Sequence, residues 1–129
     1  MSIVNHTQIE PLYLTGMVDE EYMPESGVLT SPKYPQRYPI SHDSTQTVQV
    51  AEGKTISFTF TDFNTERGYD YVEIIDEDGT NLTPGPDAPK LWGSQPRLQG
   101  LSNSNIMHVK FHTDGSGQRT GWRMEWNEQ

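Results

Sequence analysis

Short segments in which apolar and polar residues alternate run through most of this chain, and turn-forming residues separate them. Alternation with a period of two is typical of strands that bury one face. The clearest segments are residues 47–50, 55–60, 70–76, 106–112 and 121–126. No segment combines a helical period with capping residues. The pattern therefore predicts an all-β fold, an antiparallel two-sheet sandwich.

The alternation also predicts which side chains meet between the two sheets. If every segment turns one face inward, those faces form a single core. A chain of 129 residues is long enough to bury such a core without disulfides. Eight side chains are predicted to belong to it: Ile56, Phe58, Phe60, Val72, Ile74, Val109, Phe111 and Trp122.

The first 24 residues follow no clear period. We expect an N-terminal arm at residues 1–24, with a strand at 11–14, that docks on a sheet edge or on a neighbouring molecule. Such docking would make a homo-oligomer. The sandwich domain is then expected at residues 25–129.

Charge and composition exclude several functions. The net charge of −9 argues against nucleic-acid binding, which needs basic patches, and fits calcium, a basic protein partner or simply solubility. Apolar runs are only a few residues long, so we expect no membrane insertion. No serine or threonine has a plausible histidine–aspartate pair, and no glycine-rich loop precedes a helix. We therefore expect a protein that is not an enzyme.

Residues 27–39 run from a short strand signal into a turn that contains three prolines. Proline fixes φ and lacks an N–H donor, so no helix or central strand can pass through this segment. It is expected to cross the surface as a rigid, extended stretch that holds Tyr34 and Tyr38 in fixed directions.

This proline-rich segment and five later ones resemble the CUB domain, an extracellular β-sandwich found in complement proteases, tolloid-like proteases, neuropilins and spermadhesins. The resemblance covers roughly residues 26–126 and implies a secreted protein-interaction module with a jelly-roll-like sandwich. Two glycosylation sequons, at Asn5 and Asn81, agree with a secreted protein. The matching segments, in order, are 27–39, 58–66, 69–74, 90–93, 105–114 and 120–122.

The chain departs from that family because it contains no cysteine. Zero cysteines alone would instead favour a reducing compartment. By the resemblance, Trp92 and about Arg67 occupy the positions of one usual disulfide, and about Thr45 occupies half of the other. A disulfide that closes such loops contributes about 2–4 kcal/mol. We expect a largely buried Trp92 ring to compensate for part of that loss.

Acidic residues gather where the predicted strands end. Glu66 follows one strand and Asp70 opens its hairpin partner, so both emerge at the same end of the sandwich. Asp114 follows the 105–112 strand and precedes a glycine-rich loop. Three adjacent carboxylates repel one another unless a cation neutralises them, and Ca²⁺ prefers such oxygen ligands. The alternative is three solvated loop acids in an acidic chain.

The resemblance assigns roles at this predicted calcium site. It implies that Glu66, Asp70 and Asp114 are ligands, that Ser116 contributes its carbonyl, and that Tyr38 orients Glu66. Gln118, or Gly117 through its carbonyl, takes the place of an asparagine of the family.

Three functions remain open at this point. The first is a calcium-dependent, extracellular protein-interaction module, whose partner approaches the acidic end with a lysine or arginine. The second is a carbohydrate-binding sandwich, which needs exposed aromatic rings; the candidates are Trp92, Trp122, Tyr34 and Tyr69. The third is a structural protein that forms oligomers through its arm.

Overall fold

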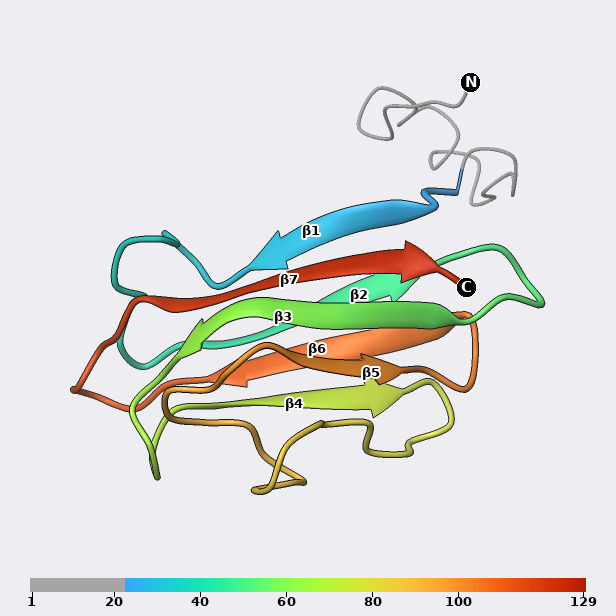
Figure 1. The fold of residues 1–129 in the computed structure, drawn as a ribbon. Coiled ribbons are helices and arrows are strands. Elements are labelled where there is room, and N and C mark those ends of the chain that lie inside the picture. The colour runs from blue at the N-terminus through green and yellow to red at the C-terminus, as the bar shows by residue number, and fades with distance from the viewer. Residues whose placement is uncertain (1–22) are drawn as a thin grey trace.

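A computed structural model describes residues 23–129, which form seven strands and no helix (Figure 1). Within these residues, no helix could cross a membrane. The predicted strand at residues 11–14 lies outside the described residues. The predicted boundary between arm and domain, at residue 24, lies at their margin. The strands are β1 (Ser26–Thr30), β2 (Asp43–Gln49), β3 (Ile56–Asn64), β4 (Tyr71–Asp76), β5 (Leu98–Leu101), β6 (Ile106–His112) and β7 (Gly121–Glu128).

The seven strands form two sheets that face each other (Figure 1). One sheet has four strands in the order β1-β7-β3-β5, and the other has three in the order β2-β6-β4. All neighbouring strands pair antiparallel. The predicted fold class, an all-β antiparallel sandwich of two sheets, is confirmed.

The core between the sheets contains all eight side chains that alternation placed there, and none is more than 2% exposed. Trp122 occupies the middle of this core. Its ring meets Phe60 of the four-stranded sheet at 5.9 Å between centroids, and Phe111 of the three-stranded sheet at 5.8 Å. Both contacts are edge-to-face, the arrangement that aromatic quadrupoles favour. One tryptophan thus ties the two sheets together.

Two parts of the chain differ from the sequence prediction. Strand β5 was not predicted; it pairs with β3 at the edge of the four-stranded sheet. Residues 90–92, part of a segment that resembles the family, contribute only an isolated bridge between Leu91 and Val72. The proline and glycine residues before this bridge limit its length because they interrupt regular pairing.

Trp92 is not buried as predicted. The bridge to Val72 turns Leu91 into the core, where it is fully buried. Because side chains alternate along an extended backbone, Trp92 then points out of the sandwich and stays partly exposed. There its ring meets the edge of Tyr71 at 6.3 Å, and the Lys90 ammonium lies 5.5 Å from it. The ring therefore does not replace a disulfide inside the core.

Hydrogen bonds hold together the segments around residues 65 and 93, close to the positions where the family resemblance places a disulfide. The N–H of Thr65 donates to the carbonyl of Gly93 at 3.0 Å, and the N–H of Gly93 donates to Thr65 Oγ1 at 3.1 Å. Nearby, the guanidinium of Arg67 lies against Gly93, where a Cβ would collide with it, and pairs with Asp87 at 3.0 Å. These neutral and charged contacts connect the two segments without sulfur.

Three loops meet at one end of the sandwich, at the left in Figure 1. They are residues 31–42 between β1 and β2, 65–70 between β3 and β4, and 113–120 between β6 and β7. Two backbone hydrogen bonds join them: Ser41 N–H to the Asp114 carbonyl at 2.7 Å, and Tyr38 N–H to the Arg119 carbonyl at 3.2 Å. The residues predicted for the calcium site all lie in these loops.

Candidate metal centre

Glu66, Asp70 and Asp114 come together at this end of the sandwich. One carboxylate oxygen from each lies within 4.8 Å of the other two. Asp70 is fully buried, whereas Glu66 and Asp114 are partly exposed. The sequence-based expectation that the three side chains are neighbours agrees with this geometry.

A tight turn brings Glu66 back toward Asp70. The carbonyl of Glu66 accepts hydrogen bonds from the N–H of Tyr69 at 3.2 Å and from that of Asp70 at 3.0 Å. The hydroxyl of Thr65 donates to the carbonyl of Asp70 at 2.8 Å and closes the same turn from its other side. The short loop therefore directs both carboxylates into one cluster.

Tyr38 connects the proline-rich loop to this cluster from inside the protein. Its hydroxyl donates to Asp70 Oδ2 at 2.6 Å and accepts a hydrogen bond from the N–H of Glu66 at 3.1 Å. Burial, and then the hydrogen bond to Asp70, raise the pKa of Tyr38 well above its ordinary value. The hydroxyl therefore stays protonated and holds Asp70 in place. The resemblance implied that Tyr38 orients Glu66; here its hydroxyl meets the backbone N–H of Glu66 and the carboxylate of Asp70.

Glu66 lies in an unfavourable place for a negative charge. Burial raises the pKa of Glu66, and the carboxylates of Asp114 and Asp70 raise it further. Its Oε1 is buried and has no hydrogen-bond partner among the residues described. Buried polar atoms are rarely left unpaired, so this oxygen calls for a partner that residues 23–129 do not supply.

Asp114 is held by the backbone on both sides. Its N–H donates to Asp70 Oδ1 at 2.8 Å, and its own Oδ1 accepts the N–H of Ser116 at 3.2 Å. Ser116 is exposed in the loop that follows. These hydrogen bonds fix the position of Asp114 next to Asp70. They also hold the first residues of the loop that contains Ser116, whose carbonyl was predicted as a ligand.

Gln118 and Gly117, the two candidates for the position of the family's asparagine, both have other partners. The Gln118 side chain points inward, and its Nε2 donates to the carbonyl of Tyr38 at 2.6 Å. The carbonyl of Gly117 accepts a hydrogen bond from the Arg119 guanidinium at 2.7 Å. Gly117 also lies directly against the Glu66 carboxylate, so that a Cβ at this position would overlap it. Nothing in the sequence indicated these loop contacts.

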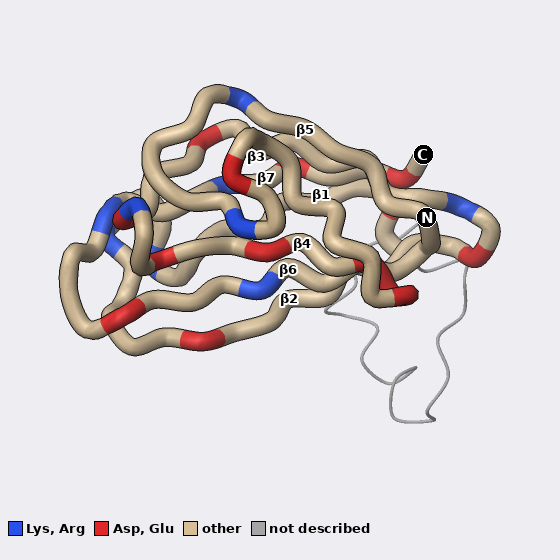
Figure 2. The backbone as a smooth tube through the Cα atoms, turned by 90° about the horizontal axis from the view of Figure 1, so that it is seen from below, with Lys and Arg blue, Asp and Glu red and all other residues tan. Residues whose placement is uncertain are grey.

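The donor set fits a hard divalent cation. It consists of three carboxylates, and one of their oxygens is buried and has no partner among the residues described. Within residues 23–129, none of these carboxylates forms an ion pair with a lysine or arginine. Figure 2 shows acidic and basic segments next to one another at this end, on the left of the view. The acids therefore remain available to a metal ion.

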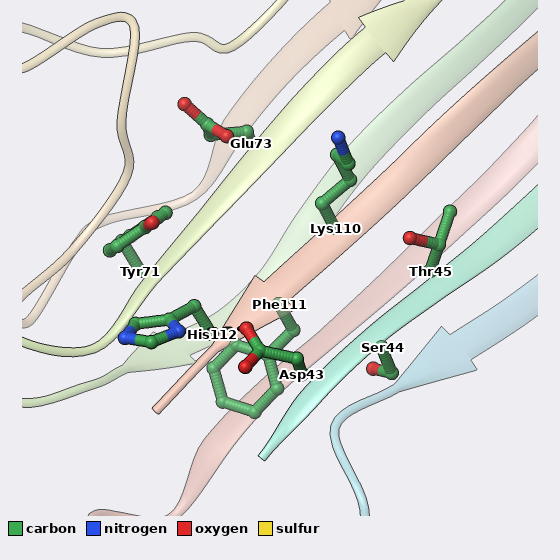
Figure 3. A pocket seen from close by; sticks show the side chains of 8 residues that line it. All are labelled: Asp43, Ser44, Thr45, Tyr71, Glu73, Lys110, Phe111 and His112. Carbon is green, nitrogen blue, oxygen red and sulfur yellow. Dashed lines mark hydrogen bonds and ion pairs between the residues drawn. The ribbon is translucent and has the colours of Figure 1, made fainter. Parts of the chain in front are cut away.

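A second candidate site is a pocket of about 390 Å³ on the outer face of the three-stranded sheet (Figure 3). Two of its charged groups pair with each other, since His112 Nδ1 lies 2.7 Å from Asp43 Oδ1. The ring of Tyr71 contacts the His112 ring and the Lys90 ammonium. The pocket is thus a polar surface whose charged groups are paired only in part. Its lining consists of Asp43, Ser44, Thr45, Tyr71, Glu73, Lys110, Phe111 and His112.

The aromatic residues named for sugar binding are mostly unavailable. Trp122 is fully buried, and Tyr34 and Trp92 are partly buried. The hydroxyl of Tyr34 also donates to Asp62 at 2.6 Å. Tyr69, 59% exposed, is the one exposed ring of the four.

Comparison with known proteins gives the family. Residues 19–126 match the family model of the CUB domain. The chain belongs to the CUB domain family. The match begins inside the segment predicted as an arm and ends near the last strand, so it includes both sheets of this CUB domain.

The relatives that this chain matches are much longer proteins, and the similarity covers a small part of each. Rat cubilin is 33% identical over 108 residues, and mouse tolloid-like protein 1 is 30% identical over 102 residues. These alignments cover 78% and 76% of the chain but only 3% and 10% of those proteins. A crystal structure of the MASP-1 CUB2 domain bound to Ca²⁺ superposes with a TM-score of 0.70 at 26% identity. That alignment covers 81% of the chain and 94% of the MASP-1 domain.

Proposed function

We propose that this CUB domain is a non-catalytic, secreted protein-interaction module whose acidic end binds Ca²⁺ and then a basic partner. The observation that carries the proposal is the unpartnered, buried Oε1 of Glu66 beside Asp70 and Asp114. The similarity to a CUB domain that binds Ca²⁺ supports it.

In this proposal Glu66, Asp70 and Asp114 supply carboxylate oxygens, Ser116 supplies its carbonyl, and Tyr38 orients Asp70. A bound Ca²⁺ would neutralise three like charges that otherwise repel one another. Because these groups belong to different loops, the ion would also fix the loops relative to one another. Its role is to preorganise a binding surface.

Two exposed apolar side chains flank the centre. Ile40 is 47% exposed and precedes Ser41, whose N–H donates to the Asp114 carbonyl; Tyr69 is 59% exposed and precedes Asp70. An acidic patch with apolar neighbours suits a partner that presents a lysine or arginine beside apolar residues. The net charge of −9 would attract such a partner from a distance.

Addition of calcium is expected to stabilise the protein. A ligand that binds the folded state but not the unfolded chain adds about 2.7 kcal/mol at 100 times its dissociation constant. Thermal melting during a calcium titration, reversed with EDTA, measures this increment. Asp114→Ala should remove it, whereas Asp43→Ala, an exposed acid on the three-stranded sheet, should keep it. A melting temperature that is the same in calcium and in EDTA would contradict the proposal.

Peptides selected by this domain in calcium are expected to carry lysine or arginine beside an apolar residue. Selection from a random peptide library, repeated in EDTA and with Asp114→Ala, measures the dependence on calcium. For a selected peptide, Tyr69→Ala and Ile40→Ser should each weaken binding by about tenfold, a loss of more than about 1 kcal/mol that only a minority of interface residues produce. Val28→Ser and Leu101→Ser, which are as exposed but lie on β1 and β5, are the matched controls. Selected peptides without basic residues would refute a basic partner.

The sequon at Asn81 remains a predicted glycosylation site. Asn81 is exposed and bridges to Ile75, near the end of β4 that lies away from the candidate metal centre. A glycan there would leave the acidic end open to a partner. Asn5, the other sequon, lies outside the described residues.

A further inference from the structure

Arg119 lies in the loop between β6 and β7 and turns back over that loop. One guanidinium nitrogen donates to the carbonyl of Gly117 at 2.7 Å and to that of Gln118 at 3.3 Å. The carbonyl of Arg119 accepts the N–H of Tyr38 at 3.2 Å, so the backbone at this residue is tied to the proline-rich loop. The side chain is thus a cation attached to the rim of the candidate metal centre.

This cation acts on the carboxylates without pairing with them. Gly117, whose carbonyl Arg119 holds, lies directly against the Glu66 carboxylate. Burial and the neighbouring acids raise the pKa of Glu66, and the charge of Arg119 acts in the opposite direction. Yet Arg119 makes no ion pair with a carboxylate among residues 23–129. Through its contact with Gly117, the guanidinium lies near the Glu66 carboxylate, and no ion pair within residues 23–129 neutralises its charge.

We propose that Arg119 weakens calcium binding at this centre and thereby sets the affinity of the domain for the ion. The inference rests on the calcium function proposed above. Two effects act in the same direction. The fixed positive charge repels an incoming dication, and the guanidinium occupies the Gly117 carbonyl, an oxygen that could otherwise turn toward the ion.

The size of the effect follows from the charge. A single positive charge several ångströms from a dication near the protein surface changes the dissociation constant by about three- to tenfold at low ionic strength. Salt reduces such an effect, because the Debye length falls from about 30 Å at 0.01 M to about 3 Å at 1 M. A purely structural role of Arg119 would show no such dependence on salt.

Calorimetric titration with Ca²⁺ at low and at high ionic strength tests the proposal. Arg119→Met, which removes the charge and keeps the length of the side chain, should bind Ca²⁺ about three- to tenfold more tightly than the wild type at low salt. The difference should shrink at high salt. Arg119→Lys keeps the charge and should stay close to the wild type. Lys54→Met removes the same charge in the turn between β2 and β3, at the other end of the sandwich, and should leave the affinity unchanged.

The outcomes separate this inference from the function on which it rests. If the wild type binds Ca²⁺ and Arg119→Met binds it equally or more weakly, the inference is overturned and the calcium function stands. If the wild type does not bind Ca²⁺, the calcium function itself fails. Melting in EDTA checks that each variant is folded, and Arg119→Gln serves as a second neutral variant should Arg119→Met not fold.

Discussion

Asp70→Ala is expected to lower the free energy of unfolding by about 2–4 kcal/mol even in EDTA. The Tyr38 hydroxyl and the Asp114 N–H both donate to the Asp70 carboxylate, at 2.6 Å and 2.8 Å, inside the protein. Truncation leaves both donors without an acceptor, and each buried, unsatisfied group costs about 1–3 kcal/mol. Relief of repulsion from Glu66 and Asp114 offsets part of that loss. Urea denaturation in EDTA measures the remainder.

Asp114→Ala provides the matched comparison for this result. Asp114 is partly exposed, and its side chain accepts the N–H of the exposed Ser116. We expect this variant to keep most of its stability in EDTA and to lose the calcium increment. Asp70→Ala should lose both. If Asp70→Ala is as stable as the wild type in EDTA, the buried hydrogen bonds of Asp70 do not hold the three loops together.

The alternation of apolar and polar residues predicted the strands and their buried faces correctly where one face of a strand is buried and the other is exposed to solvent. Phe58, Phe60, Val109 and Phe111 are examples, because a shift of one residue would expose a whole apolar face. The same rule located the strand ends, and with them the loops that carry Glu66, Asp70 and Asp114. The candidate centre could therefore be predicted from the sequence as a set of neighbouring acids.

Edge elements could not be predicted in the same way. Strand β5 is four residues long, and its Gly100 lies against the Phe58 ring, so the segment offers little alternation to read. At residues 90–92 the difficulty is the direction of the side chains, because a single bridge determines which of them points inward. That bridge buries Leu91 and leaves Trp92 outside. A family pattern at this position did not determine the direction of the side chain.

The paths of the loop backbones could not be predicted from the sequence either. Gly117 has a φ of +81°, which favours glycine, and this conformation lets its backbone lie against Glu66 while its carbonyl meets Arg119. Sequence composition indicates that a glycine-rich loop can take many paths, but not which one it takes. The contacts of Arg119 and Gln118 at the centre therefore emerged only from the structure.

The largest loss of stability is expected when a core ring is removed, because this sandwich has no disulfides. Trp122→Ala should cost about 3–5 kcal/mol, the usual range for a buried aromatic side chain. Trp122 is fully buried and contacts Phe60 and Phe111 on opposite sheets, so its removal separates both faces of the core. That loss is as large as the contribution of a typical disulfide, about 2–4 kcal/mol.

Trp92→Ala is the control for this prediction, since it removes an equal ring from the outer side of the sandwich. Trp92 contacts only the edge of Tyr71 and the Lys90 ammonium among the aromatic and cation contacts described, and such exposed contacts contribute about 1 kcal/mol. Urea denaturation of both variants gives the comparison, with Trp122→Phe as the milder variant should Trp122→Ala not fold. Equal losses at the two positions would mean that the contacts of Trp92 with Tyr71 and Lys90 contribute as much stability as the contacts of Trp122 in the core. A loss confined to Trp122 would place the stability of this cysteine-free domain in the contact between its two sheets.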